Sequence, residues 1–212
     1  MKREFFIFFV LALLGGCSFF ANKPPIPPLP NLERIAPEKL TLDDLPSRGL
    51  KGSKVLVVQI SDFQCPFCAK SHEAMEREIF PKYKDRVEFR FKQFPIGHHE
   101  WASRAAAVSL CAGEQGKFWE AADFFFSHQI EIEARTFGDF LDRLTREAKL
   151  EKAVLAACLE KGEADQKARR DFDESLAAGI QGVPTVLVNG WKLEGLLETG
   201  DIEKAIEAEL SR

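Results

Sequence analysis

The sequence predicts an α/β fold in which a block of helices interrupts a strand-rich part of the chain. Strand patterns occur before residue 95 and again after residue 183, whereas residues 99–179 show almost only helical spacing. The length of 212 residues suggests one domain, or one domain with an insertion, and a hydrophobic content of 45% is enough for a core. The net charge of −4, with both signs mixed along the chain, argues against nucleic-acid binding.

The strand-rich part is expected to follow the order β-β-α-β, then the helical block, then β-β-α. Weak alternation in "KLTLDD" (39–44) suggests a short edge strand, and "SRGLKGSK" (47–54) is expected to be a turn-rich break. Residues 55–63, "VLVVQISDF", are β-branched and apolar on both faces, which predicts a buried central strand. Further along we expect a helix over about 66–80, strands over 87–94, 184–190 and in "WKLEG", and a last helix over about 201–210.

The helical block contains several separate stretches with helical spacing. They are "WASRAAAVSLCAGEQ", "KFWEAADFFFSHQ", "FGDFLDRLTREA", "EKAVLAACLEK" and "ADQKARRDFDESLAAG". Thr136, with Asp139 three positions later, is typical of a capping box at the start of the third stretch. The run Phe124, Phe125 and Phe126 is expected to form core of this block, although one of these rings could line a groove.

The first residues have the pattern of an export signal. Lys2 and Arg3 precede an apolar run over 5–14, which is too short to span a bilayer because that takes roughly 20 apolar residues. The ending "LLGGC" resembles the lipobox of bacterial lipoproteins, and this resemblance implies cleavage before Cys17 and lipidation of that cysteine. The alternatives are an ordinary signal peptide cut slightly later and an uncleaved anchor.

A proline-rich segment, "NKPPIPPLPN", follows the expected lipidation site. Such a composition favours extended polyproline II structure, which acts as a semi-rigid spacer. The spacer would hold a folded domain away from a membrane surface. We therefore expect an exported, membrane-anchored lipoprotein that faces the periplasm or the exterior of the cell envelope.

Two cysteines with two residues between them, Cys65 and Cys68, directly follow the expected central strand. Structural zinc usually needs four ligands, and the histidines and other cysteines offer no second pair with suitable spacing. A c-type haem would need a histidine directly after Cys68, where Ala69 stands. A redox pair fits best, with a static disulfide as the alternative, and no metal or organic cofactor is expected. The four histidines, at positions 72, 98, 99 and 128, receive no role.

The spacing of the pair assigns a role to each cysteine. Pro66 is a favoured first helical residue, which places Cys65 at the helix N-cap. Unpaired backbone N–H groups and the helix dipole favour negative charge there, so the reactive thiolate form of Cys65 is stabilised. Cys68 stands one turn into the same helix face and could attack a mixed disulfide formed at Cys65. We therefore expect Cys65 to be the nucleophile and Cys68 the resolving thiol.

Three stretches carry a family resemblance. The motifs "DFQCPFCAKSH", "CAGEQGKFWEAADFFF" and "GVPTVLVNG" resemble the DsbA-like branch of the thioredoxin superfamily. The resemblance runs from about Leu40 to the end of the chain and implies a thioredoxin fold with an inserted all-helical domain. Together with the N-terminal pattern, it divides the chain into a signal peptide (1–16), a lipidated N-terminus with its tether (17–38), an N-terminal thioredoxin-fold part (39–97), the helical insertion (98–179) and a C-terminal thioredoxin-fold part (180–212).

The resemblance also implies further site residues. Pro184 matches the cis-proline that faces the active disulfide, with the Val183 backbone free to pair with an extended substrate; Pro66 and Phe67 would contact that substrate too. An ordinary turn at 183–184 is the alternative. Phe67 replaces a histidine that is common in this branch, so one stabiliser of the thiolate is absent. Gln59 stands where the superfamily often has a carboxylate that moves a proton to the resolving thiol, so water or another group would have to do this.

The remaining cysteines, Cys111 and Cys158, lie in the helical block. An exported chain meets an oxidising compartment, where disulfides persist. We therefore expect a structural disulfide between these two residues, with two free buried thiols as the alternative.

Together these features imply a protein thiol–disulfide oxidoreductase that introduces disulfides into exported proteins through the Cys65–Cys68 pair. The expected partners are unfolded or reduced exported proteins, a membrane redox partner that resets the pair, and the membrane itself through the N-terminal lipid. A monomer is expected, because too few residues separate Asn31 from the first strand for a dimerisation module. The alternatives are an isomerase or reductase with the same fold, and a non-catalytic, chaperone-like binding module with a static disulfide.

Overall fold

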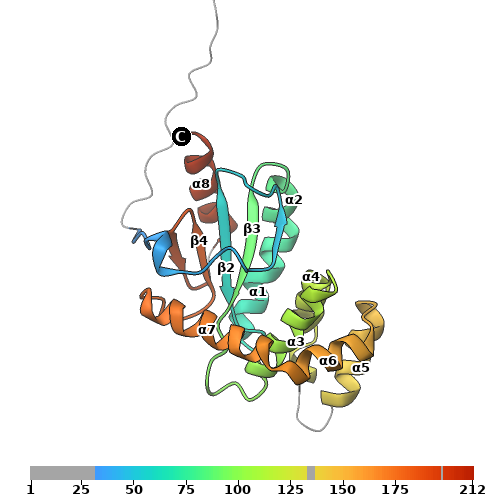
Figure 1. The fold of residues 1–212 in the computed structure, drawn as a ribbon. Coiled ribbons are helices and arrows are strands. Elements are labelled where there is room, and N and C mark those ends of the chain that lie inside the picture. Colours follow the sequence, from blue (N-terminus) through green and yellow to red (C-terminus); the bar gives the residue numbers. More distant parts are fainter. Residues whose placement is uncertain (1–31, 133–136, 197) are drawn as a thin grey trace, which may run out of the picture.

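The computed structural model describes residues 32–132, 137–196 and 198–212, and it confirms a thioredoxin-like α/β fold with a helical insertion (Figure 1). A mixed sheet has the strand order β1-β3-β2-β4-β5. Its strands are β1 (Ser47–Gly49), β2 (Leu56–Ser61), β3 (Glu88–Gln93), β4 (Thr185–Val188) and β5 (Trp191–Glu194). Strands β2 and β3 are parallel, and the other neighbouring pairs are antiparallel. The predicted central strand is therefore confirmed.

The predicted helical block is also confirmed, since each of its stretches forms a helix between β3 and β4. These helices are α3 (Ala102–Glu114), α4 (Phe118–Ser127), α5 (Phe137–Glu147), α6 (Lys152–Lys161) and α7 (Glu163–Ala177), with a short 3-10 helix, η3 (Gln129–Glu131), after α4. Outside the block lie η1 (Pro37–Lys39), α1 (Pro66–Ala74), the π-helical turn η2 (Met75–Ile79), α2 (Phe80–Tyr83) and α8 (Thr199–Leu210). The capping box predicted at Thr136 falls outside the described residues.

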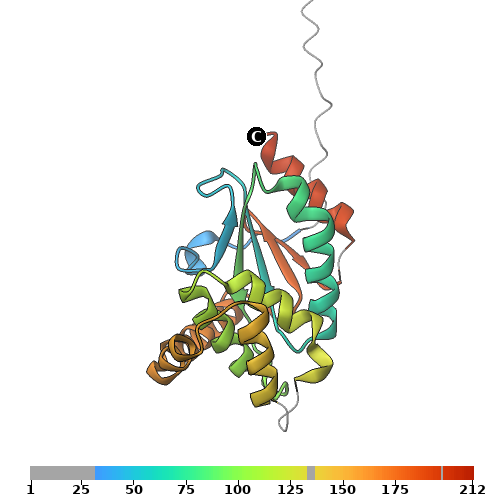
Figure 2. The same cartoon turned by 90° about the vertical axis from the view of Figure 1, so that its right-hand side faces the viewer.

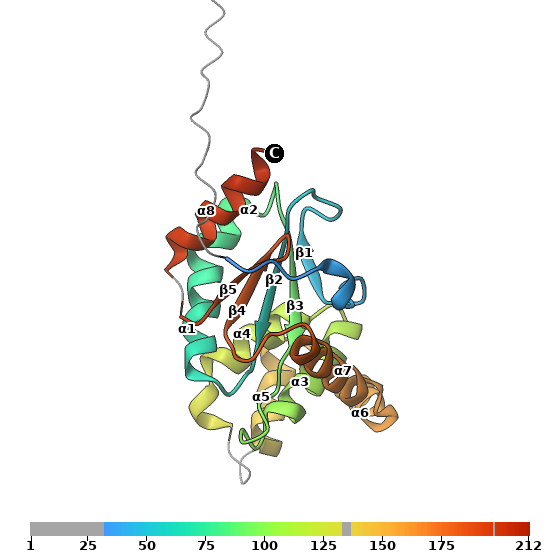
Figure 3. The same cartoon turned by 90° about the vertical axis from the view of Figure 1, so that its left-hand side faces the viewer.

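The helices lie in two groups around the sheet. Helices α1, α2 and α8 cover one face, which Figure 2 and Figure 3 show from opposite sides. On that face Val57 and Val186 pack with Met75 and Ile202. Helices α3–α6 gather at the end of the sheet where β2 leads into α1, and α7 returns from them toward the sheet. The core of this block extends to the two cysteines of the pair, so the pair lies where the two parts of the fold meet.

The helix after the cysteine pair runs further than predicted. It continues past Phe80 to Tyr83, with the π-helical turn η2 in its middle. Pro81 has no N–H to donate, and its ring would collide with the carbonyl four residues earlier in a regular helix. A π-helical turn directly before the proline avoids this collision. Met75, Ile79 and Tyr83 consequently remain buried against the sheet.

The predicted edge strand at 39–44 is wrong. The edge strand is β1, in the segment predicted to be a turn-rich break, and it pairs with β3. In the 39–44 segment, Thr41 donates from its backbone N and from Oγ1 to the Glu174 carboxylate, at 3.0 and 2.7 Å, so this segment packs on α7 instead. Strand β1 ends at Gly49 with φ +82°, where a Cβ would lie 2.5 Å from the Val87 carbonyl oxygen, which only glycine avoids.

None of the helices among the described residues is both long enough and apolar enough to cross a membrane.

Candidate active site

Cys65 and Cys68 lie at the start of α1, and both thiols are free. Cys65 occupies the N-cap with an extended backbone (φ −77°, ψ 119°), and Pro66 is the first helical residue. The Ala69 N–H donates to the Cys65 carbonyl at 3.1 Å, which begins the helix. Cys68 is 0% exposed and Cys65 is 5% exposed, whereas Phe67, which stands between them, is 55% exposed. A partner can therefore reach this turn at Phe67, while Cys68 is closed off.

The two thiols have very different acidities. A hydrogen bond from the Cys68 side chain, helped by the N–H groups of Cys68 and Phe67, lowers the pKa of Cys65 from 9.0 to about 6. Burial raises the pKa of Cys68 far above its ordinary value, and the neighbouring Cys65 raises it further. Cys65 is therefore a thiolate at neutral pH, and Cys68 is a thiol that donates to it.

The loop before β4 brings a second part of the chain to the pair. The Val183–Pro184 peptide bond is cis, and the Val183 carbonyl oxygen lies 3.9 Å from Cys65 Sγ. Strand β4 begins directly after Pro184 and pairs antiparallel with β2, whose end leads to Cys65. The sheet thus brings Cys65 and Val183, which are 118 positions apart in the sequence, next to each other.

A buried carboxylate, Asp62, supports the turn that leads to Cys65. One carboxylate oxygen accepts the Gln64 N–H at 2.6 Å, and the other accepts the Ile96 N–H at 2.7 Å and contacts His99 Nδ1 at 2.9 Å. Its negative charge raises the pKa of Cys65, opposing the effects described above. Sequence reasoning missed both Asp62 and His99. Only the position of Asp62, three residues before Cys65, could have indicated it.

The helical block is hydrogen-bonded to the same turn. Gln129 Nε2, in η3, donates to the carbonyl oxygens of Phe63 and Cys65 at 2.8 and 2.9 Å. Phe126 is buried as predicted for this aromatic run, and its ring centroid lies 4.9 Å from that of Phe63. Gln59 is buried on β2, and its Nε2 has no hydrogen-bond partner within the described part of the chain. Sequence reasoning did not identify Gln129, because nothing in its spacing links it to the cysteines.

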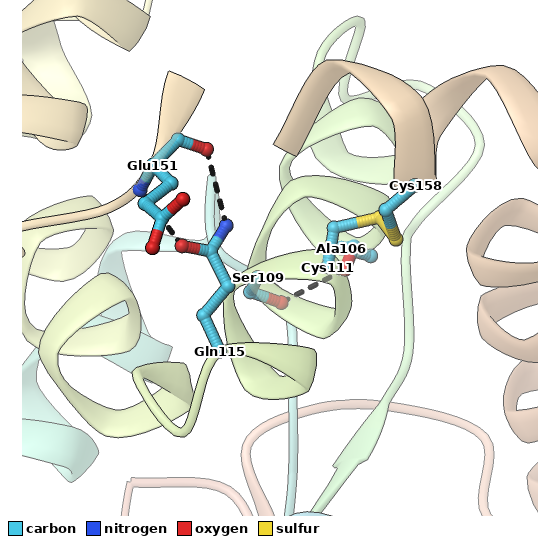
Figure 4. The surroundings of a disulfide bond; sticks show 6 residues. All are labelled: Ala106, Ser109, Cys111, Gln115, Glu151 and Cys158. Atoms are coloured by element: carbon cyan, nitrogen blue, oxygen red, sulfur yellow. Dashed lines mark hydrogen bonds between the residues drawn. A yellow bond between two sulfur atoms is a disulfide. The ribbon is translucent and has the colours of Figure 1, made fainter. Parts of the chain in front are cut away.

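Cys111 and Cys158 are joined by a disulfide that links α3 to α6 (Figure 4). Their Cα atoms lie 5.7 Å apart, and both residues are buried. Near this bond, Gln115 at the end of α3 is hydrogen-bonded to the backbone of Glu151 at the start of α6. This disulfide therefore belongs to the packing of the block, separate from the Cys65–Cys68 pair. The predicted lipidation site, Cys17, lies outside the described residues.

Another polar group lies on α1, one turn beyond Cys68. His72 Nε2 contacts Asp123 Oδ1 at 2.7 Å, and Glu76 offers a third possible metal-ligand atom, with all three atoms within 4.8 Å of one another. Arg48 already pairs with both Glu76 carboxylate oxygens, and its guanidinium lies 3.8 Å from the centroid of the Trp119 ring. Since a metal ion would have to displace Arg48, these residues fit a hydrogen-bonded bridge between α1 and α4 better than a metal centre.

The comparison with known families agrees with this geometry. A family model described as thioredoxin matches residues 43–208, which is more than half of the chain. The chain belongs to the thioredoxin family. Its fold is similar to that of a periplasmic thioredoxin-like protein from Salmonella enterica serovar Typhimurium, with TM-score 0.68 and 19% identity over 79% of this chain and 91% of that one. It is also similar to the thiol-disulfide exchange protein alpha-DsbA2 from Wolbachia pipientis, with TM-score 0.70 and 16% identity over 80% and 89% of the two chains.

Curated relatives of this thioredoxin-family chain bear a different kind of name. It is 31% identical over 149 residues to Na(+)/H(+) antiporter NhaA 3 of Salinispora tropica, covering 70% of this chain and 22% of that protein. It is 28% identical over 209 residues to Na(+)/H(+) antiporter NhaA 1 of Mycolicibacterium vanbaalenii, covering 94% of this chain and 32% of that protein. The chain thus spans about a third or less of the length of these relatives.

Proposed function

We propose that this protein is an exported, membrane-tethered thiol–disulfide oxidoreductase that introduces disulfides into exported proteins. The observation that carries the proposal is the Cys65 thiol, with a pKa of about 6, next to the buried Cys68 and 3.9 Å from the Val183 carbonyl oxygen. In this proposal Cys65 is the nucleophile and Cys68 the resolving thiol. A stable Cys65 thiolate favours the reduced form of the pair, which makes the disulfide a stronger oxidant.

The proposed reaction starts from the oxidised pair. A substrate thiolate attacks Cys65 Sγ, a new S–S bond forms, and the Cys65–Cys68 bond breaks with its electron pair going to Cys68 Sγ. A second substrate thiolate then attacks the substrate sulfur of this mixed disulfide, and Cys65 leaves as a thiolate. The substrate loses two electrons and the pair gains them. A membrane redox partner accepts these electrons and restores the disulfide.

The substrate is proposed to bind as an extended segment across the pair. The Val183 backbone would pair with it, as in a short form of strand addition, with Pro184 holding the loop in place. Pro66 and the exposed ring of Phe67 would contact it from α1. Unfolded chains are the substrates that offer such extended segments, which is the reason for proposing unfolded or reduced exported proteins.

Two cysteine variants test the chemistry. Reduced Cys68→Ser should accumulate mixed disulfides with a disulfide-bonded, unfolded model substrate, because its Cys65 thiolate opens the substrate disulfide and no thiol at position 68 is left to displace the substrate, whereas Cys65→Ser should accumulate none. The oxidised parent should introduce disulfides stoichiometrically into the reduced form of this substrate. Equal trapping by both variants would contradict the assigned roles. Rapid insulin reduction without net oxidation would favour the isomerase or reductase alternative, and substrate binding without thiol exchange would favour the chaperone-like module.

Export and tethering rest on the N-terminal pattern, "MKREFFIFFVLALLGGC", and on the periplasmic location named for the Salmonella protein. Cys17→Ser should block lipidation and move the protein from the membrane fraction to the soluble fraction, or leave an uncleaved precursor. Metabolic labelling with a radioactive fatty acid checks this directly. Label that remains on the Cys17→Ser protein would show that the anchor lies elsewhere.

The division of the chain at 16, 38, 97 and 179 and the monomeric state belong to the same proposal. Size-exclusion chromatography with light scattering tests the monomer. The antiporter activity named for the longer relatives is not carried over, because this chain matches about a third or less of their length.

A further inference from the structure

Each turnover of the proposed exchange places negative charge on a buried sulfur. When substrate opens the disulfide, Cys68 leaves as a thiolate; when the pair is reoxidised through a mixed disulfide at Cys65, Cys68 must attack as a thiolate. Cys68 is 0% exposed, so water does not solvate that charge. Gln59 cannot accept a proton as a carboxylate would, and Asp62 is already engaged by Gln64, Ile96 and His99. Some other group must stabilise the Cys68 thiolate.

Strand β2 directs one hydroxyl toward that sulfur. Alternate residues of a strand face opposite sides of the sheet. Val57 packs with Met75 and Ile79 below α1, whereas Val58 and Ile60 belong to the core on the other face. The side chain of Ser61 therefore lies on the α1 face, at the end of β2 that leads to the cysteine turn.

The hydroxyl of Ser61 is left unpaired in the described structure. Its Oγ is buried and has no hydrogen-bond partner, sulfur included, among the described residues. The Ser61 hydroxyl and the Asp62 backbone N–H nevertheless both lower the pKa of Cys68, because they favour its thiolate. A buried hydroxyl without a partner is unfavourable, so this position destabilises the fold unless the sulfur uses the donor.

We infer that the Ser61 hydroxyl and the Asp62 backbone N–H form a thiolate-binding site for Cys68, donating hydrogen bonds to its sulfur whenever that sulfur carries charge. This inference rests on the proposed thiol exchange and assigns Ser61 to one half of it. Ser61 accelerates the steps in which the bond between Cys65 Sγ and Cys68 Sγ breaks or forms. The first attack by the Cys65 thiolate on an external disulfide does not involve Ser61.

A two-step reaction with 5,5′-dithiobis(2-nitrobenzoate) separates these events. The Cys65 thiolate attacks the reagent, releases one thionitrobenzoate and keeps the other as a mixed disulfide. The Cys68 thiolate then attacks Cys65 Sγ, the second thionitrobenzoate leaves with the electron pair, and the Cys65–Cys68 disulfide forms. Rapid-mixing absorbance times both releases with one equivalent of reagent, and Cys68→Ser should show the first release only.

Ser61→Ala should slow the second release about tenfold to a hundredfold below the pKa of Cys68, because a hydrogen bond to a charged group is lost. Its pH profile should move to higher pH, while the rate of the first release is unchanged. Ser61→Thr retains the hydroxyl and should react like the parent, whereas Ser61→Val, with the shape of threonine but no hydroxyl, should react like Ser61→Ala. Ser109→Ala is the matched control, because that buried hydroxyl donates to the Ala106 carbonyl instead.

The outcomes distinguish the inference from the function on which it rests. If the parent gives a rapid second release and Ser61→Ala matches it at every pH, the inference is wrong and the exchange chemistry stands. If Ser61→Thr is as slow as Ser61→Val, shape matters rather than the hydroxyl, and the inference is also wrong. If the parent never gives a second release, both the proposed function and the inference fail. The Thr and Val variants share one shape, so their comparison remains valid even if Ser61→Ala does not fold.

Discussion

The low pKa of Cys65 makes the reduced protein sensitive to pH near neutrality. The alkylation rate of Cys65 should rise as the pH passes about 6 and then level off, rather than rise near the ordinary value of 9.0. Because the folded pKa lies below the unfolded one, the thiolate contributes stability that is complete above about 9 and is lost as the pH falls through about 6. The rate of alkylation by iodoacetamide against pH checks the first statement, and the melting temperatures of the reduced and oxidised protein against pH check the second. A midpoint near pH 9 in either curve would contradict the corresponding statement.

Asp62 acts on Cys65 in the opposite direction. Asp62→Asn removes a negative charge and should lower the pKa of Cys65 below about 6. The same change should destabilise the protein by about 1–3 kcal/mol, because an amide cannot accept all the hydrogen bonds that this carboxylate accepts. Thiolate absorbance against pH and urea unfolding measure the two effects. Asp123→Asn, which changes a carboxylate bonded to His72, is the control and should leave the pKa of Cys65 unchanged.

The sequence predicts some residues of the site better than others. The spacing of Cys65 and Cys68 and the proline between them define a helix N-terminus locally, so their placement follows from a few neighbouring residues. Val183 and Pro184 could be placed only through a family resemblance. His99 and Gln129 could not be placed at all, because their contacts depend on the path of the loops after β3 and α4 rather than on any periodic pattern.

At the scale of elements, α7 is fixed to the sheet by a buried charge. Lys92 of β3 is 0% exposed, and its Nζ lies 3.1 Å from Asp171 and 2.7 Å from Glu174. Asp171→Ala should cost about 3 kcal/mol, at the lower end of the range for an uncompensated buried charge because Glu174 remains. Asp173→Ala, at an exposed position on the same helix, should have almost no effect. Urea unfolding of both variants measures these costs. If Asp171→Ala is as stable as Asp173→Ala, Glu174 alone satisfies Lys92.

The disulfide between α3 and α6 should stabilise the helical block. The bonded residues are 47 positions apart, and replacing both cysteines by alanine should cost about 2–5 kcal/mol. Urea unfolding measures the cost, with Cys65→Ala/Cys68→Ala as the matched double variant. A non-reduced digest analysed by mass spectrometry reports the bond itself. Two alkylatable thiols at 111 and 158 in protein purified without reductant would contradict the bond.

Segments with a strong hydrophobic periodicity were predicted correctly, whereas the segment with a weak periodicity was not. The alternation over 87–94 and the helical spacing of the block each indicate one structure, and the chain adopts it. The alternation over 39–44 is short, and its residues bind α7 rather than a neighbouring strand. The true edge strand β1 has only three residues, and it depends on the turn at Gly49, which hydrophobic pattern does not reveal.

At the scale of the molecule, the candidate active site is assembled from three parts of the chain. The turn over 62–65 supplies the cysteine, η3 supplies Gln129, and the loop before β4 supplies Val183. Ion pairs and aromatic contacts between the sheet and the block hold these parts together. Substitutions in the helical block should therefore alter the reactivity of Cys65, even where they lie far from it in sequence.

The strand order also governs when the candidate active site is completed as the protein is made. The central strand β2 cannot pair with β4 until almost the whole chain has left the ribosome, since Val57 pairs with Val188. Pairings so distant in sequence form slowly. A nascent chain that has emerged only as far as α7 carries Cys65 and Cys68 without their partner Val183. The candidate site is therefore completed only when β4 has paired with β2, so the cysteine pair emerges well before the loop that faces it.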